Sequence, residues 1–346
     1  MIDAQAYVLR ETGVIPELED IQVSGELTAG QVRLKVLYSG LCATQMEEIF
    51  VSSRNTKYMP HLFGHEGVGV IEAVGPGVTT KQVGDTCVIH WRQSSVGLDA
   101  NPGSYFVSGK KINSGKVVTF STQVVVPENR TSHLPVGFTT NMGALLGCSL
   151  TTGWGSVAKV GQHKSSDRVL IVGLGAVGTS AAWTAFKRGS QTVLGVDSKP
   201  SVAARWSSSG VTHFFASISD LVDTSSTDAN LSSIDLAIET SGNSEVIEFL
   251  VNNLPDRARL VLVGMPSSKR FPELNIQRLL DGLSLTGSNG GSVDPGQDLE
   301  PVASQFMSLL DSHLGGSVLT LEKDSLAAAI SHFRDGSFLR IVLALG

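Results

Sequence analysis

Residues 168–189 read RVLIVGLGAVGTSAAWTAFKRG, and this segment indicates the architecture of half the chain. An apolar run is followed by Gly173, Gly175 and Gly178 in the spacing G-x-G-x-x-G, and then by a segment of helical composition that we expect to end at Gly189. The first glycine permits a tight turn, the second lets a pyrophosphate approach the backbone, and the third lets helix and strand pack closely. The segment therefore predicts a strand, a turn and a helix whose N-terminus binds phosphate.

The next apolar run, TVLGVD, ends on Asp197, which lies 197 − 178 = 19 positions after the last glycine. An acidic residue about 20 positions on binds a ribose 2′-hydroxyl and repels a 2′-phosphate. We therefore predict NAD(H) rather than NADP(H); the alternative is a set of turn glycines and a loop aspartate. The residues expected to bind the cofactor are Gly173, Gly175, Ala176, Val177, Gly178, Asp197 and Lys199.

Two kinds of apolar pattern divide the chain. After residue 150 the apolar runs are nearly continuous, which is typical of parallel strands buried on both faces. These runs are RVLIVG, TVLGVD, IDLAIE and RLVLVG. Before it, short β-rich runs such as VRLKVLYSG and TQVVVPENR are broken by Gly and Pro, which favours a barrel or sandwich. We expect an α/β protein with domains at 1–149 and 150–290, and a segment at 291–346 whose final strand, in FLRIVLAL, returns to the first domain.

Composition excludes several classes of protein. The 346 residues are 41% hydrophobic with a formal charge of −6, and no basic cluster is longer than Lys110-Lys111, so a nucleic-acid partner is not expected. Three cysteines without paired spacing indicate a reducing compartment. No apolar leader and no apolar stretch of about 20 residues is present, so we predict a cytoplasmic protein that does not enter a membrane.

Three residues have side chains that suit a catalytic zinc. Cys42 lies in GLCATQ, His65 in FGHEGVG and Cys148 in LLGCSLTTGWG. A catalytic zinc usually takes three protein ligands and leaves its fourth position for water or substrate. Two buried cysteines and a core histidine are the alternative, because free cysteine is among the most buried side chains.

Taken together, these motifs resemble the zinc-dependent medium-chain alcohol dehydrogenase/reductase family. The resemblance extends over nearly the whole chain. It rests on the segment GHEGVGVIEAVGPGV with Gly84-Asp85, and on the order of the motifs Cys, GHE, Cys and GLGAVG. It implies a GroES-like β-barrel catalytic domain made of both chain ends, a Rossmann doubly wound parallel sheet between them, and an active-site cleft at their junction. It implies that Cys42, His65 and Cys148 hold one catalytic zinc, and that Glu66 can approach the metal; an arginine-paired buried carboxylate is the alternative for Glu66.

The resemblance also implies roles for three residues outside the ligand set. Thr44 resembles the family hydroxyl that begins the proton relay, although it could instead cap a turn. Trp91 falls where the family has an aromatic wall of the substrate pocket, with a core tryptophan as the alternative. Arg340 resembles an arginine that reaches the cofactor pyrophosphate and neighbours the glutamate after the zinc histidine; an edge-strand charge is the alternative.

The chain departs from the family pattern in two regions. The segment at 92–118 lacks the four cysteines of the structural-zinc lobe, so we predict no structural zinc there and a loop that shapes the pocket or the subunit contact. Near the ligands, Gln45 stands where many relatives have an aspartate that orients the zinc histidine, and Ala43 where they often have a basic residue. Glu47 replaces the relay histidine of some relatives and could pass protons or face solvent.

We therefore predict an NAD- and zinc-dependent oxidoreductase that transfers hydride between an alcohol and the cofactor. Primary alcohols, secondary alcohols and sugar-like polyols all remain open as substrates. The alternatives are a zinc-free quinone or enoyl reductase of the same superfamily, or a cofactor-binding protein without activity. The resemblance alone implies a homodimer or homotetramer through the sheet edge near LSLTGSNGG.

Overall fold

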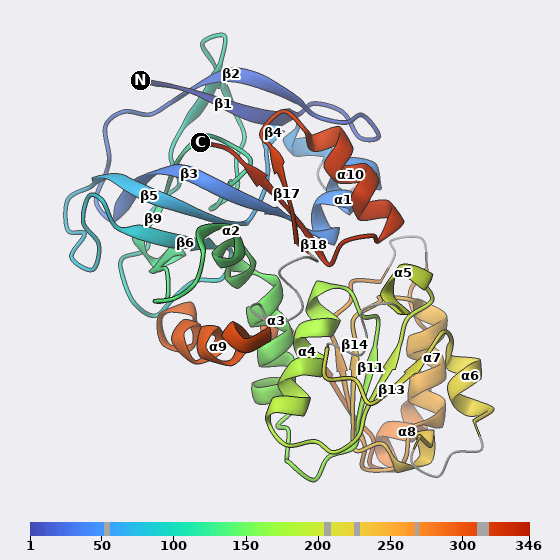
Figure 1. Ribbon diagram of the computed structural model, residues 1–346. Helices are drawn as coiled ribbons and strands as arrows, with labels where there is room; N and C mark the ends of the chain where they lie inside the picture. The colour runs from blue at the N-terminus through green and yellow to red at the C-terminus, as the bar shows by residue number, and fades with distance from the viewer. Residues whose placement is uncertain (52–55, 204–208, 225–228, 267–269, 310–317) are drawn as a thin grey trace. The chain divides into compact units, whose positions relative to one another are not determined.

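The computed structural model describes residues 1–51, 56–203, 209–224, 229–266, 270–309 and 318–346 (Figure 1). Within them the chain forms two compact units. The first contains Met1–Cys148, Asp294–Met307 and the described C-terminal residues, and the second contains Ser149–Val293 with Ser308 and Leu309. The first unit thus combines residues from the beginning and the end of the sequence.

The first unit is built mainly from two sheets. Its strands are β1 Ile2–Leu9, β2 Glu17–Val23, β3 Gln31–Leu41, β4 His61–Leu62, β5 Glu66–Val74, β6 Thr86–His90, β7 Tyr105–Val107, β8 Lys110–Ile112, β9 Gln123–Pro127, β10 Thr131–His133, β17 Val318–Glu322 and β18 Arg340–Ala344. One sheet has the order β4-β1-β2-β7-β8, and the other has the order β10-β6-β5-β3-β18-β17, with β9 also paired to β3. The helical segments are α1 Ala43–Phe50, η1 Thr56–Tyr58, η2 Glu128–Arg130, α2 Thr140–Gly143, η3 Ala144–Gly147, α9 Pro295–Leu309 and α10 Leu326–Asp335.

The apolar core of this unit lies between the two sheets. Ala6 and Val8 enter it from β1, and Leu34 and Val36 enter it from β3, all at most 1% exposed. Their spacing of two follows from the alternation of side chains along a strand. The expected GroES-like barrel fold is confirmed in this unit.

The final strand, β18, is an inner strand of the second sheet. It pairs antiparallel with β3, where Ile341 lies opposite Leu41, and parallel with β17. The register places Arg340 across from Cys42. This pairing brings the first and last parts of the sequence into one sheet.

The second unit contains a six-stranded parallel sheet. Its strands are β11 Val169–Val172, β12 Val193–Val196, β13 His213–Phe215, β14 Leu236–Glu239, β15 Arg259–Leu262 and β16 Ser284–Gly287, in the order β13-β12-β11-β14-β15-β16. Its helical segments are α3 Ser149–Gly155, η4 Ser156–Val160, α4 Ala176–Lys187, α5 Pro200–Ala203, α6 Ile218–Val222, η6 Leu231–Ser233, α7 Ser244–Asn253, α8 Ile276–Leu280 and η7 Gly290–Ser292. No helix in the described part of the chain is long and apolar enough to cross a bilayer.

Helices cover both faces of this parallel sheet. Leu170 of β11 belongs to the apolar cluster that includes Leu250 of α7, whereas Ile171 belongs to the cluster that includes Ala181 of α4. Figure 1 shows α4 and α7 on opposite sides of the strands. The strand order and the two cores confirm the expected doubly wound Rossmann sheet.

The cysteine-free segment at 92–118 is more than the loop expected from sequence, because β7 and β8 form a hairpin within it. Beside this lobe, the Glu128 carboxylate is 0% exposed and accepts hydrogen bonds from two directions. Oε2 accepts from the Leu98 amide (2.8 Å), and Oε1 accepts from the Thr80 amide (2.8 Å), the Thr80 hydroxyl (2.7 Å) and the Thr79 amide (3.2 Å). One carboxylate therefore ties the lobe to the turn at 79–80.

We expect Glu128→Gln to lower the free energy of unfolding by about 2 kcal/mol at neutral pH, because the amide NH₂ would face a backbone donor. Burial acts to raise the pKa of Glu128, but the hydrogen bonds from Leu98, Thr80 and Thr79 outweigh it and lower the pKa. The stabilisation is therefore present above the unfolded pKa and is lost as pH falls through the folded value.

Denaturant unfolding at several pH values measures this difference. The difference in free energy of unfolding between the parent and Glu128→Gln should shrink as the pH is lowered below about 4. Glu72→Gln is the matched control, because Glu72 is partly exposed and accepts from the Gln123 side chain. An equal loss in both variants would show that Glu128 has no special role.

Candidate metal centre and nucleotide-binding loop

Cys42, His65 and Cys148 lie together in the first unit. Cys42 follows β3 and is the N-cap of α1, His65 precedes β5, and Cys148 follows η3. Their ligand atoms all lie within 4.8 Å of one another, and both cysteines are buried and outside any disulfide. Three residues separated by many positions in sequence therefore form one site.

The start of α1 fixes the histidine through Gln45. The Cys42 amide donates to Gln45 Oε1 (3.1 Å), which fixes the orientation of the side-chain amide because a backbone N–H can only donate. Gln45 Nε2 is then the atom that lies 2.7 Å from His65 Nδ1. In this arrangement Nδ1 accepts and the neutral ring carries its proton on Nε2, so ligation of a metal through Nε2 would require the proton to move to Nδ1.

An ion pair lies beside the three ligands. Arg340 and Glu66 are 4% and 0% exposed, and Arg340 Nη2 donates to Glu66 Oε1. Gly40 is required opposite them, because a Cβ there would lie 2.4 Å from Glu66 Oε1. Arg340 is therefore a buried partner of Glu66 on an inner strand, and the alternative of an edge-strand charge is wrong.

The buried charges shift the pKa values of the sulfurs in opposite directions. A hydrogen bond from Cys148 lowers the pKa of Cys42 well below its usual value, helped by Arg340 and His65 and opposed by burial. The same hydrogen bond, burial and the negative charge of Cys42 raise the pKa of Cys148 well above its usual value. The two sulfurs therefore favour one thiolate and one thiol.

The glutamate and the histidine also respond to burial. Burial raises the pKa of Glu66, and the attraction of Arg340 offsets only part of this effect. Burial acts to lower the pKa of His65, but the hydrogen bond to Cys42 and its charge outweigh burial and raise the pKa. Burial therefore shifts Glu66 toward its neutral form, and the charge of Cys42 shifts His65 toward its protonated form.

The donor set fits a zinc ion. Two sulfurs and one imidazole nitrogen are the ligands of a known class of catalytic zinc site, in which a fourth position stays open. Glu66 Oε2 is buried and has no hydrogen-bond partner among the described residues, so a carboxylate oxygen is also free beside the cluster. An added cation would offset the negative charge of thiolates and carboxylate.

The remaining predicted residues of this unit lie at different distances from the cluster. The Thr44 hydroxyl is 3.6 Å from Cys42 Sγ, and the residue is exposed. Glu47 is half-buried on α1. Trp91 follows β6, is half-buried, and has the Arg92 guanidinium 5.6 Å from its ring centre. Of these, the structure brings only Thr44 into contact with a ligand residue.

Sequence reasoning missed a buried carboxylate–imidazole contact near α1. Glu48 Oε1 lies 3.6 Å from His61 Nε2, and both side chains are largely buried. Burial raises the pKa of Glu48, while His61 and His65 act to lower it. The two histidines four positions apart in HLFGHE were the available signal, but the burial of Glu48 could not be inferred from its neighbours in sequence.

The glycine loop of the second unit has the geometry expected of its residues. Gly173 has φ +86°, and a Cβ on Gly178 would lie 1.7 Å from the Gly173 carbonyl oxygen. Gly175 is the N-cap of α4. Asp197 Oδ2 accepts from the Leu174 amide (2.7 Å), so the acidic residue after β12 also holds the loop. A pyrophosphate can approach this backbone because no side chain stands on Gly175.

Three more predicted residues lie around this loop. Ala176 and Val177 are the first residues of α4, directly after Gly175. Lys199 is exposed, and its amide donates to Asp197 Oδ1 (2.9 Å). These positions surround the N-terminus of α4 and the end of β12, as a nucleotide site at this sheet edge requires.

The turn after β14 braces the glycine loop and was not predicted. The Thr240 hydroxyl lies within hydrogen-bond distance of the carbonyl oxygens of Gly173 (2.8 Å) and Val172 (3.0 Å). Glu239 is 0% exposed and accepts from the Ser241 amide (2.7 Å) and the Ser241 hydroxyl. An acidic residue at the end of the apolar run IDLAIE was the signal for such a turn.

Known proteins match both units. A family model described as "Alcohol dehydrogenase GroES-like domain" matches residues 28–136, and one described as "Zinc-binding dehydrogenase" matches residues 176–308. Alcohol dehydrogenase 1 of Pisum sativum is 27% identical over 335 residues, which cover 89% of this chain and 88% of the relative.

Solved structures share the fold over the full length. Benzyl alcohol dehydrogenase from Acinetobacter calcoaceticus has a TM-score of 0.85 at 22% identity and is matched over 100% of both chains. An "Alcohol dehydrogenase zinc-binding domain protein" from Burkholderia ambifaria has a TM-score of 0.84 at 23% identity, covering 100% of this chain and 99% of the other. At these identities the similarity concerns the fold.

The buried ion pair can be tested by a double-mutant cycle. We expect Glu66→Gln to lower the free energy of unfolding by about 3 kcal/mol, because Arg340 would remain buried without a partner charge. Arg340→Met should have a similar cost. The double variant should be less destabilised than the sum of both, with a coupling of about 2 kcal/mol measured by denaturant unfolding. Additive losses would show that the pair is not coupled.

Proposed function

Because the chain belongs to the zinc-type medium-chain alcohol dehydrogenase family, we propose that it uses zinc and NAD(H) to interconvert a small alcohol and its carbonyl product. Membership makes it an alcohol dehydrogenase-family oxidoreductase. The single observation that carries the finer proposal is the convergence of Cys42, His65 and Cys148 within 4.8 Å. The zinc-free reductases of the superfamily lack this ligand set, so its presence favours the zinc-dependent reaction.

Cys42, His65 and Cys148 would hold the metal, and the glycine loop would hold the dinucleotide. When bound, zinc would supply a Lewis acid for the alcohol oxygen and NAD would accept hydride from the carbinol carbon. The sulfurs of Cys42 and Cys148 would supply the negative charge that retains the cation. One metal per chain is proposed, because the lobe at 92–118 contains no cysteine.

The proton released from the alcohol requires an acceptor close to the ligands. We assign this role to Thr44, and its 3.6 Å contact with Cys42 Sγ and its exposure to solvent support the assignment. Glu47, half-buried on the same helix, would accept the proton next. Trp91 would form an aromatic wall of the substrate pocket, and Arg340 would contribute charge toward the cofactor pyrophosphate.

The cofactor is proposed to be NAD(H) because Asp197 places a carboxylate beside the loop at Leu174. A 2′-phosphate at that position would be repelled by the carboxylate, whereas a ribose hydroxyl could donate to it. Cytoplasmic location, and assembly as a homodimer or homotetramer, stay predictions from the sequence.

Zinc content and turnover together test the proposal. We expect about one zinc per chain in protein purified without added metal, because three ligands and one open position define one catalytic site. Cys148→Ser should lose most of the zinc and most of the alcohol-dependent reduction of NAD. Cys87→Ser is the matched control, since Cys87 is also buried but lies outside the cluster.

Each alternative function predicts a different result. Zinc-independent turnover of a quinone or enoyl substrate would support the zinc-free reductase. Bound cofactor without turnover across a panel of primary alcohols, secondary alcohols and polyols would support a non-catalytic protein. Either result would reject the proposed reaction.

Charge at Asp197 should set the cofactor preference. We expect Asp197→Asn to reduce the ratio of kcat/KM for NADH over NADPH by about tenfold, because the repulsion of a 2′-phosphate disappears while one acceptor oxygen remains. Steady-state kinetics with both cofactors measures the ratio. Asp220→Asn, an exposed acidic residue of α6, should leave it unchanged. Equal use of NADPH and NADH by the parent protein would contradict the assignment.

A further inference from the structure

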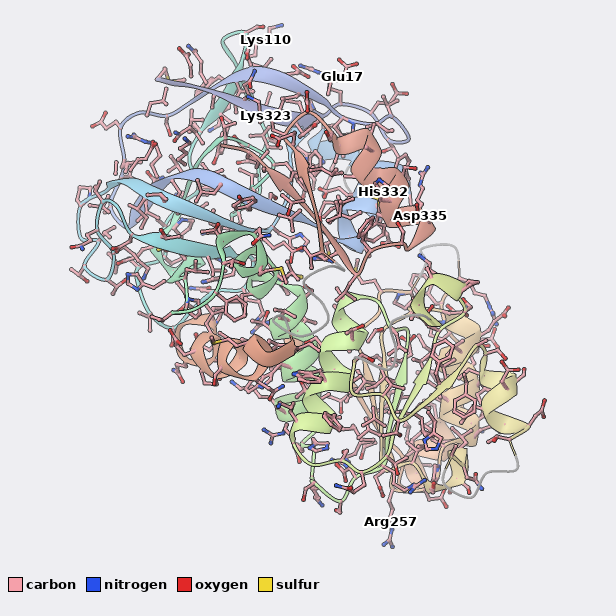
Figure 2. The ribbon with its side chains drawn as sticks, viewed as in Figure 1. Glu17, Lys110, Arg257, Lys323, His332 and Asp335 are labelled. Atoms are coloured by element: carbon pink, nitrogen blue, oxygen red, sulfur yellow. The ribbon has the colours of Figure 1, made fainter. Side chains whose placement is uncertain are left out.

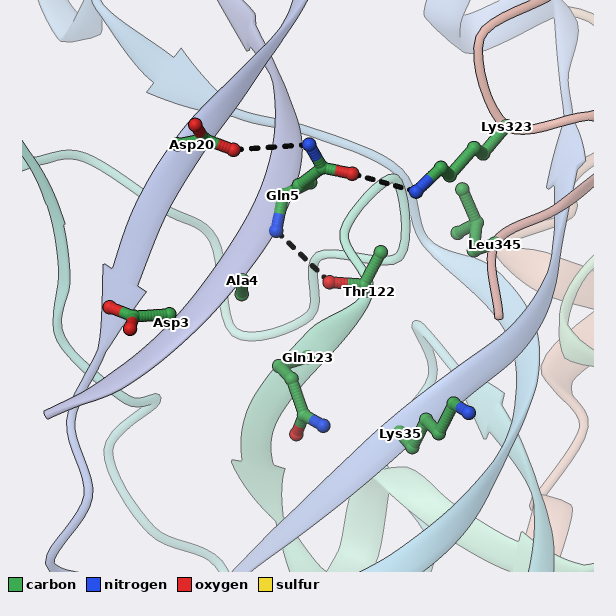
Figure 3. A pocket seen from close by; sticks show the side chains of 9 residues that line it. All are labelled: Asp3, Ala4, Gln5, Asp20, Lys35, Thr122, Gln123, Lys323 and Leu345. Atoms are coloured by element: carbon green, nitrogen blue, oxygen red, sulfur yellow. Dashed lines mark hydrogen bonds between the residues drawn. The ribbon is translucent and has the colours of Figure 1, made fainter.

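The first unit contains a pocket that the proposed reaction does not use. Its volume is about 390 Å³, and Figure 3 shows its lining residues, which are Asp3, Ala4, Gln5, Asp20, Lys35, Thr122, Gln123, Lys323 and Leu345. The pocket includes Lys35 of β3, seven positions before Cys42. At about 3.3 Å per residue, the strand separates the two sites by roughly 20 Å. The pocket is therefore distinct from the metal centre.

The charged groups of this pocket are sorted by sign. Asp3 and Asp20 come from β1 and β2, whereas Lys35 and Lys323 come from β3 and the turn after β17. Figure 3 shows the carboxylates on one side of the pocket and the lysines on the other. Among the described residues, Lys35 has no carboxylate within ion-pair distance, and Asp3 receives one hydrogen bond, from Gln22 (3.2 Å). The pocket thus has a negative wall and a positive wall.

Gln5 shows the direction of the field between the walls. Its Nε2 donates to Asp20 Oδ1 (3.0 Å), and its Oε1 accepts from Lys323 Nζ (2.7 Å). Its backbone amide donates to the Thr122 hydroxyl (3.0 Å), which holds the residue between the walls. The side-chain amide dipole is therefore aligned with the field, with its positive end toward Asp20.

A ligand with one charge gains from one wall and is repelled by the other. A ligand with an ammonium at one end and a carboxylate at the other gains from both, because the field acts on its dipole as it acts on Gln5. Ala4 and Leu345 are buried apolar residues that offer contact to a short methylene chain. The lining thus favours opposite charges separated by a short apolar linker.

We propose that this pocket binds a small zwitterion, of the class of an amino acid whose ammonium and carboxylate are separated by a few methylene groups. The ammonium lies toward Asp3 and Asp20, and the carboxylate lies toward Lys35 and Lys323. The site takes no part in hydride transfer, so its occupancy does not depend on the proposed function.

Calorimetric titration of the zinc-loaded protein tests this proposal. The probes are 4-aminobutyrate and 6-aminohexanoate, with butylamine and butyrate as analogues that each lack one charge. We expect at least one amino acid to bind about fivefold more tightly than both analogues. Equal binding of all four probes, or no binding at millimolar concentrations, would overturn the proposal.

Two variants locate the binding. Lys35→Gln and Asp20→Asn, both at exposed side chains, should each weaken binding of the tighter amino acid about fivefold. Lys110→Gln is the matched control, an exposed lysine of β8 outside the pocket lining (Figure 2), and it should bind as the parent does. Unchanged binding in Lys35→Gln and Asp20→Asn would place the ligand elsewhere, the metal centre included, and would also overturn the proposal.

Discussion

The antiparallel register of β18 on β3 is the constraint on which the candidate metal centre depends. Ile341 and Leu343 enter the core between the sheets, so Arg340 points to the opposite side, toward Cys42 and Glu66. A shift of one residue would exchange the two faces and move the guanidinium away from both. The apolar alternation of the last strand therefore controls the electrostatics of a site made largely by the first half of the chain.

Charge balance follows from that position. Arg340 is a permanent cation, and it faces two sulfurs and the Glu66 carboxylate, which together would carry three negative charges if fully ionised. One guanidinium cannot balance them in a buried setting, so Cys148 retains its proton while Cys42 favours the thiolate. A divalent cation would remove this restriction, because it favours deprotonation of both sulfurs. Without the cation, Arg340 is the permanent positive charge that balances the Cys42 thiolate. With the cation bound, the cluster would carry both positive charges against two thiolates and a carboxylate.

The sequence predicted features that depend on local pattern. The strands of the parallel sheet, the turn at Gly173 and the position of Asp197 follow from runs and spacings that a short window contains. Glu128 and Glu48 could not be assigned, because each is buried by segments distant in sequence and takes its partners from them. Glu239 accepts from Ser241 and Gly242 in its own turn, but its complete burial could not be inferred from that short window. The β7–β8 hairpin was missed for the same reason: its strands have three residues each and take their stability from β2.

Gln45 shows why the identity of the ligands does not by itself set the metal chemistry. A histidine that binds a metal through Nε2 carries its proton on Nδ1 and needs an acceptor there. In this chain the neighbouring amide presents Nε2 to His65 Nδ1, because its only oxygen is engaged by the Cys42 amide. An aspartate or glutamate could accept both donors with two oxygens, whereas glutamine must share one. Metal binding would therefore compete with the hydrogen bond from the Cys42 amide to Gln45, at a cost of about 1 kcal/mol, and would couple the first turn of α1 to the metal affinity of the site.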